Sequence, residues 1–208
     1  MIKNLLLTAI IVALSACAGP QVTRVQELSA TADAPYSNVL VISLFKSFDA
    51  RRYLEQALVK QLSEHGVTAV ASTSMMDTRT PVTRETFLAM VEAQGSDAVL
   101  ITQLMNLDTK TKVTDARPQS TYKVRNTYYY NVWDVNLMEF VAPQDLQLKH
   151  SIFLSTQLYS ADKHELVWAI ESNTEISSNF STRGNTAFIT DEAKAITRYL
   201  SRDGLLAP

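Results

Sequence analysis

Residues 39–45 are the feature that most constrains the fold of this chain, because they form an apolar run interrupted only by Ser43. A run of this length, rich in β-branched residues, is typical of a strand that is buried on both faces, as in a parallel sheet. Parallel strands need crossover connections, which are usually helices. The chain offers two such connections, because apolar residues recur at helical spacing after Asp49 and again over residues 83–94.

The first of these helices has a predicted start and a predicted end. Asp49 is the expected N-cap, and Gly66 stands where a left-handed residue closes a helix. We expect one side of this helix to face the core and the other to face solvent. The inward stripe is Tyr53, Leu54, Ala57, Leu58 and Leu62, and the solvent side carries Arg51, Arg52, Glu55, Lys60 and Glu64.

The remaining pattern completes an α/β (α+β mixed) fold. The order β-α-β-α-β predicts parallel strands with right-handed crossovers. Long antiparallel strands and a C-terminal helix follow, all on one mixed sheet. Beyond residues 39–45, the expected strands are 67–71, 97–104, 120–141, 150–160 and 164–176, and the last helix is expected near 186–202.

The N-terminus predicts export. Lys3 precedes an apolar stretch over residues 5–14, which is too short to cross a membrane core and is typical of a signal peptide. The sequence Leu14-Ser15-Ala16-Cys17 comes directly after it and resembles the lipobox of bacterial lipoproteins. The resemblance implies cleavage before Cys17 and attachment of acyl chains such as palmitate to that residue. The alternative is a soluble exported protein that happens to retain Cys17.

Lipidation predicts both the location and the domain organisation. Cys17 is the only cysteine, so the mature chain can form no internal disulfide. In such lipoproteins an Asp after the cysteine suggests inner-membrane retention; Ala18 stands there, which implies the periplasmic face of the outer membrane. We expect a signal peptide over 1–16, a lipidated tether over 17–37 and one domain over 38–208. A flexible tether of this length would reach roughly 25 Å.

Several segments together resemble the N-terminal domain of TolB and related small envelope lipoproteins, including the penicillin-binding-protein-activator type. These segments are the strand at 39–45, the helix with Leu54 and Leu58, the Gly95-Ser-Asp entry into the next strand, and the hairpin at 157–168. The resemblance covers roughly residues 38–205, although it fits the β-rich elaboration at 106–150 poorly. It implies binding to other envelope proteins and supplies no catalytic residues.

Composition and motifs exclude several classes of protein. The net charge of −2 is not typical of a protein that mainly binds nucleic acid. The five glycines lie too far apart for a Walker A motif, a dinucleotide-binding loop or a G-x-S-x-G elbow. His65, His150 and His164 lack the spacing of a zinc site. We therefore expect no enzymatic activity, no metal and no cofactor.

The aromatic stretch at 122–133 is the candidate binding segment. On a strand, Tyr122, Tyr128 and Tyr130 would share one face, and the alternation shifts at Trp133. Three interpretations stay open: a core strand, a strand that faces a protein partner, or a groove for an apolar ligand. Within the second, the partner-binding residues are Tyr122, Tyr128, Tyr130 and Trp133.

Taken together, these patterns predict a membrane-anchored periplasmic lipoprotein of the cell envelope. We expect a non-catalytic binding or accessory module for an envelope protein complex. One alternative is a carrier or chaperone for lipid or another apolar ligand. A second alternative is a hydrolase of envelope polymers, which would need facing carboxylates or a Ser beside His150 or His164. The oligomeric state stays open.

Overall fold

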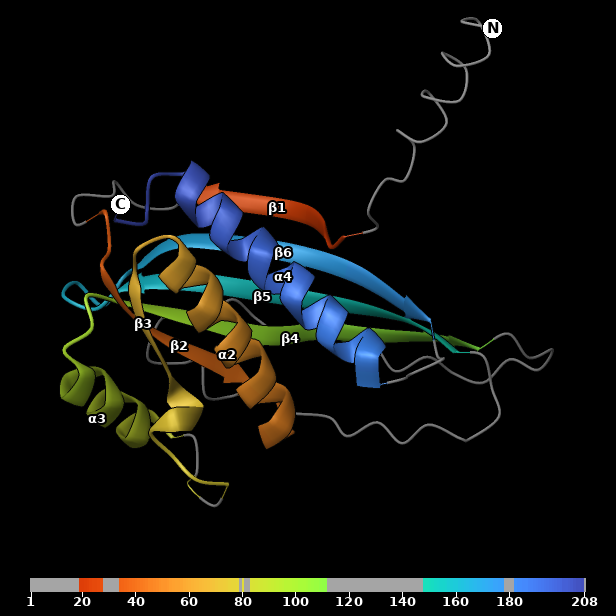
Figure 1. Ribbon diagram of the computed structural model, residues 1–208, viewed down its shortest axis with the longest axis horizontal. Coiled ribbons are helices and arrows are strands. Elements are labelled where there is room, and N and C mark those ends of the chain that lie inside the picture. Colours follow the sequence, from red (N-terminus) through yellow and green to blue (C-terminus); the bar gives the residue numbers. More distant parts are fainter. Residues whose placement is uncertain are drawn as a thin grey trace, which may run out of the picture.

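The computed structural model describes residues 19–27, 34–78, 80, 83–111, 148–177 and 182–207. Within these residues one mixed sheet of six strands carries the helices on its two faces (Figure 1). The strand order is β1-β6-β5-β4-β2-β3. The strands are β1 (Gln21–Glu27), β2 (Asn38–Leu44), β3 (Thr68–Ala71), β4 (Ala98–Thr111), β5 (Leu148–Ser160) and β6 (Leu166–Ser177); the helices are α2 (Phe48–Glu64), α3 (Arg84–Gln94) and α4 (Thr182–Arg202), with a 3₁₀ turn η1 (Ser72–Ser74).

The expected fold class is confirmed. β2 pairs in parallel with both β3 and β4, as the β-α-β-α-β pattern predicts. β4, β5 and β6 then pair antiparallel, and α4 closes the chain. Every residue of β2 after its first is buried, which matches a strand covered on both faces.

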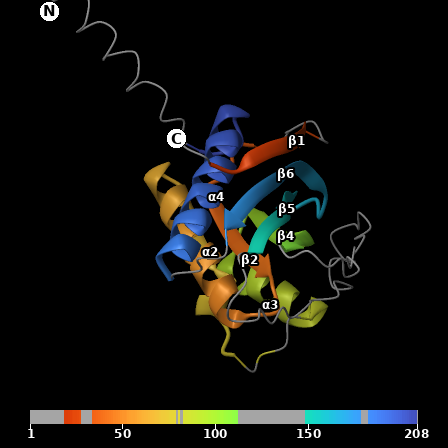
Figure 2. The ribbon, with the colours of Figure 1, turned by 90° about the vertical axis from the view of Figure 1, so that its right-hand side faces the viewer.

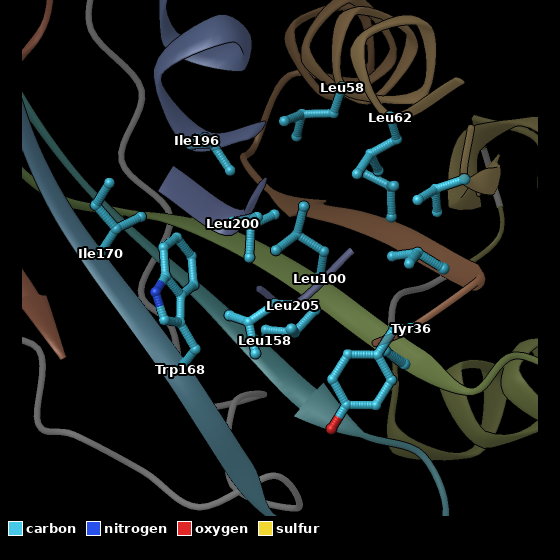
Figure 3. Close-up of a cluster of buried hydrophobic side chains, with 14 of the residues drawn as sticks. Tyr36, Leu58, Leu62, Leu100, Leu158, Trp168, Ile170, Ile196, Leu200 and Leu205 are labelled. Carbon is cyan, nitrogen blue, oxygen red and sulfur yellow. The ribbon is translucent and has the colours of Figure 1, made fainter. Parts of the chain in front are cut away.

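The helices lie on opposite faces of the sheet. Figure 2 shows α2 and α4 on one side of the strands and α3 on the other. We call the side of α2 and α4 the first face and the side of α3 the second face. Between the first face and its helices lies the larger core cluster, which Figure 3 shows, with Leu58, Leu100, Trp168 and Leu200 all buried. Each fully buried Leu contributes about 1.5–3 kcal/mol to folding.

The tether expected over residues 17–37 needs a correction. Gln21–Glu27 form the edge strand β1, which pairs antiparallel with β6. Tyr36 is buried in the core and exchanges backbone hydrogen bonds of 2.9 Å with Leu205 and Ala207 near the C-terminus. The predicted signal peptide at 1–16 lies outside the described residues.

The N-cap of α2 differs from the prediction. The side chain of Ser47, not that of Asp49, accepts a hydrogen bond from the backbone N–H of Ala50. Asp49 lies in the first turn of α2 and forms an ion pair with Arg52. Gly66 has the left-handed backbone expected after the helix.

Two further expectations are wrong in extent or orientation. β4 continues to Thr111, well beyond the end of the strand expected over 97–104. Tyr53, expected in the core, is 46% exposed, whereas Arg51 and Glu55 are buried. The expected strand at 120–141 lies outside the described residues.

Candidate binding surface

The site residues predicted from the sequence are not placed by the described structure. Cys17 and the aromatic residues Tyr122, Tyr128, Tyr130 and Trp133 all lie outside the described residues. The ends of the segment that contains the aromatics are described, because Thr111 of β4 pairs with Leu148 of β5. The two residues that flank the segment therefore lie side by side in the sheet.

Glu55 is the centre of a buried polar cluster at the carboxyl ends of β2 and β3. In many α/β folds this edge binds ligands. Here Glu55 accepts hydrogen bonds from the backbone N–H of Ser43 (2.8 Å), the backbone N–H of Thr73 (2.7 Å) and the hydroxyl of Ser72 (2.9 Å). The carboxylate of the chain itself thus occupies the donors that a ligand would otherwise use.

Arg51 lies one helical turn before Glu55 and is also buried. Its guanidinium contacts the sulfur of Met76 at 2.9 Å and lies 5.7 Å from the centre of the Phe48 ring. Burial lowers the pKa of Arg51, and the nearby Glu55 acts in the opposite direction. Burial also raises the pKa of Glu55, although its hydrogen bonds oppose this shift. The two side chains join α2 to η1 and β2, so we assign this cluster a structural role.

The second face carries a different kind of surface beyond the reach of α3. The core cluster on this face joins Phe87 and Met90 of α3 to residues of β2, the start of β4 and the end of β5. Farther along the strands the paired residues become polar. Their cross-strand rows are Gln103–Ser155–Glu171, Asn106–Phe153–Asn173–Gln21 and Asp108–Ser151–Glu175.

These rows are rich in hydrogen-bond acceptors. The amide oxygens of Gln103, Asn106 and Asn173 are buried and have no hydrogen-bond partner among the described residues. The Asn106 amide instead donates to the carboxylate of Asp108 at 3.0 Å. A buried acceptor without a donor is costly, and a water molecule or another donor normally satisfies such a group. We call this surface the acceptor face, and define it by Gln103, Asn106, Asp108, Glu171, Asn173 and Glu175.

The acceptor face opens toward β6. In the first row Gln103 of β4 is only 3% exposed whereas Glu171 of β6 is half-buried, and in the last row Asp108 is half-buried whereas Glu175 is exposed. A partner that approaches from outside would therefore meet the β6 side first.

On the first face, one buried carboxyl group lies between α4 and β6. Glu192 accepts a hydrogen bond from the hydroxyl of Ser172, and its second carboxyl oxygen has no partner among the described residues. Burial raises the pKa of Glu192 to about 6. This group lies under α4 and away from the acceptor face, so it belongs to the packing of the helix.

The described residues contain no group of three or more His, Cys, Asp or Glu side chains that could hold a metal ion. His150 is buried, and burial lowers its pKa. Among the helices that the structure describes, none is both long enough and apolar enough to cross a membrane.

No single sequence pattern identifies the acceptor face, although part of its signal is present. Ser151, Ser155 and Gln157 stand at alternate positions of β5, which places them on one side of a strand. In β6 polar residues occupy consecutive positions, so alternation does not identify the face there. The bulge between Leu104 and Asn106 also shifts the alternation in β4.

Comparisons with known proteins give no family for this chain. No family model matches it, and no curated protein matches it. The resemblance to the N-terminal domain of TolB therefore stays a prediction.

Three solved structures are similar to this chain at low identity. A PelC dodecamer from Paraburkholderia phytofirmans is 11% identical with a TM-score of 0.44, covering 90% of this chain and 99% of that chain. Lipoprotein GNA1162 from Neisseria meningitidis is 12% identical with a TM-score of 0.43, covering 80% and 99%. A minor lipoprotein from Acinetobacter baumannii is 11% identical with a TM-score of 0.40, covering 82% and 97%. Two of the three are thus bacterial lipoproteins, but these likenesses are too distant to assign a function.

Proposed function

We propose that this protein is a lipid-anchored, non-catalytic binding module of the bacterial cell envelope. The anchor is Cys17, at the periplasmic face of the outer membrane, and the acceptor face binds an envelope protein. The observation that carries the binding role is the gathering of carboxylates and amides on one face of the sheet, at Asp108, Glu171, Asn173 and Glu175.

The chemistry of the acceptor face indicates the kind of partner. Asp108, Glu171 and Glu175 add carboxylates to the amide oxygens, so the surface offers acceptors and negative charge. A protein segment that presents Lys, Arg or hydroxyl side chains would satisfy it. A lipid tail would not, because it would leave the same acceptors unpaired. This favours a protein partner over an apolar ligand at this surface.

In-cell photo-crosslinking tests the binding role. A photo-reactive residue at Glu175 should give one discrete protein adduct, whereas the same residue at the exposed Glu92 of α3 should give none. Glu171→Lys should reduce the yield of the Glu175 adduct several-fold, because it places a cation where the partner offers donors. The predicted positions Tyr122, Tyr128, Tyr130 and Trp133 belong in the same series. Folded variants that give no adduct at Glu175, or an adduct unaffected by Glu171→Lys, would refute the proposal.

Lipidation is tested separately. Cys17→Ser should abolish labelling by a fatty-acid probe and leave the uncleaved precursor. Normal processing of this variant would contradict the anchor and would leave the binding role untouched.

A further inference from the structure

The strand β1 begins very close to the proposed lipid anchor. Gln21 follows Cys17 by four residues, and four fully extended residues span at most about 14 Å. Pro20 precedes the strand directly, and its ring fixes one backbone angle and restricts the residue before it. The connection is therefore short.

β1 is an integral part of the folded domain. It pairs antiparallel with β6 from Gln21 opposite Asn173 to Glu27 opposite Trp168, with one register shift between Val22 and Arg24. Val22 and Val25 both pack against the core cluster of the first face. Because hydrogen bonds and apolar contacts hold the strand along its length, its direction is fixed relative to the rest of the domain.

We infer that the lipid surface lies against the end of the sheet where β1 begins and β6 ends. We call this the Gln21 end; it includes residues 173–177 of β6 and 150–153 of β5. The inference rests on the lipid anchor proposed above. β1 runs from Gln21 to Glu27, so the short connection from Cys17 joins the strand at the Gln21 end.

The other end of the sheet then points away from the bilayer. The part of β6 between Asn173 and its first residue, Leu166, is about 23 Å long at 3.3 Å per residue. The turn at residues 161–164 lies beyond it, as the opposite ends of β5 and β6 in Figure 1 show. In this orientation the strands extend outward from the membrane. The acceptor face then lies close to the lipid surface and faces along it.

Fluorescence quenching by the membrane tests this orientation. Cys17 is the only cysteine, and acylation blocks its thiol, so one introduced cysteine can be labelled alone. Glu175→Cys marks the Gln21 end and Lys163→Cys marks the opposite end; both positions are exposed. The full lipidated chain is reconstituted in vesicles of phosphatidylethanolamine and phosphatidylglycerol that carry a quencher on the lipid headgroup.

We expect the label at Glu175 to be quenched several-fold more than the label at Lys163. Equal quenching at the two positions would show that the sheet lies flat on the bilayer, and stronger quenching at Lys163 would show the reverse orientation. Either result overturns the inference. Insertion of a flexible Gly/Ser segment of about 20 residues before Pro20 should remove most of the difference, since it frees the domain from its anchor.

Flotation with the vesicles separates the two proposals. A chain that does not float with the vesicles lacks the anchor, and both proposals of membrane attachment then fail. A chain that floats but shows equal quenching keeps the anchor and loses only the orientation.

Discussion

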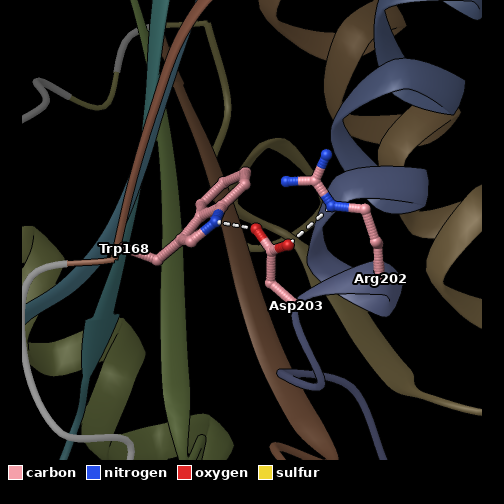
Figure 4. A network of polar contacts seen from close by, with 3 residues as sticks. All are labelled: Trp168, Arg202 and Asp203. Carbon is pink, nitrogen blue, oxygen red and sulfur yellow. Dashed lines mark hydrogen bonds and ion pairs between the residues drawn. The ribbon is translucent and has the colours of Figure 1, made fainter.

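The indole nitrogen of Trp168 donates a hydrogen bond of 2.9 Å to the carboxylate of Asp203 (Figure 4). Asp203 follows directly after α4, and Trp168 is a fully buried residue of β6, so the bond fixes the end of the helix to the sheet. Arg202 binds the other oxygen of the same carboxylate at 2.7 Å. Partial burial acts to raise the pKa of Asp203, but the hydrogen bonds from Arg202 and Trp168 outweigh it and hold the pKa below its usual value.

Asp203→Ala should lower the free energy of unfolding by about 1–3 kcal/mol, because it leaves the indole N–H of Trp168 without its charged acceptor. Arg202→Ala is the matched control and should cost clearly less than Asp203→Ala, since Arg202 is largely exposed. Chemical denaturation of both variants measures the difference. Equal losses would mean that the ion pair, rather than the bond to Trp168, fixes the helix end.

Glu192 should make the stability of the domain depend on pH. Its pKa of about 6 in the folded chain lies above the ordinary value of 4.5. Between pH 4.5 and pH 6, the folded state therefore keeps a proton on Glu192 that the unfolded state has lost. The free energy of unfolding should therefore fall as the pH rises from about 4.5 to 6, by about 2 kcal/mol from this group.

Glu192→Gln removes the titration and should flatten that part of the stability curve. Ser172→Ala is the companion variant, because it removes the hydroxyl that donates to Glu192 while leaving the carboxyl group in place. Its curve should keep the fall with pH. Thermal unfolding over this pH range provides the measurement, and an unchanged slope in Glu192→Gln would assign the pH dependence to other groups.

Glu55→Ala should destabilise the protein by about 2–4 kcal/mol, because it leaves the buried backbone N–H groups of Ser43 and Thr73 without an acceptor. Glu92→Ala makes the same change on an exposed side of α3 and should shift stability by about 0.5 kcal/mol or less. Urea denaturation compares the two. A small effect at Glu55 would contradict the structural role given to this cluster.

Gly95→Ala should cost about 1 kcal/mol, because Gly95 ends α3 with a backbone φ of +59°, a left-handed conformation that L residues with a side chain disfavour. A Cβ atom there would meet nothing within 4 Å, so the whole cost is conformational. Gly95→Asn should cost less, since Asn tolerates this conformation better. Equal melting temperatures for the wild type and the Ala variant would contradict the assignment.

The missed strand β1 shows how a local pattern can hide an element. Val22 and Val25 are three residues apart, which does not fit the alternation of a strand. The register shifts between Val22 and Arg24, and this irregularity brings both valines to the first face of the sheet. Only the partner strand β6 shows where the extra residue lies.

The prediction that Glu55 faces solvent is wrong for a related reason. On α2 it lies one turn after Arg51, and two charged residues at this spacing normally indicate a solvated face. The donors that make Glu55 a buried residue come from β2 and η1, which are distant along the chain. The acceptor face likewise combines residues of three strands, so no single stretch of sequence contains it.

Within the described residues, the sequence by itself determined the order of the elements from β2 to β4, the β5–β6 hairpin, the C-terminal helix, the parallel pairing around β2 and the position of Gly66 at a helix end. These features depend on local periodicity and backbone preference, which a short stretch of residues carries in full. The tertiary structure decided that β1 belongs to the sheet, that Arg51 and Glu55 are buried, and that the acceptors of β4 and β6 share one face. These depend on which distant strands pair and in what register, and hydrogen bonds between segments far apart in the chain fix that choice.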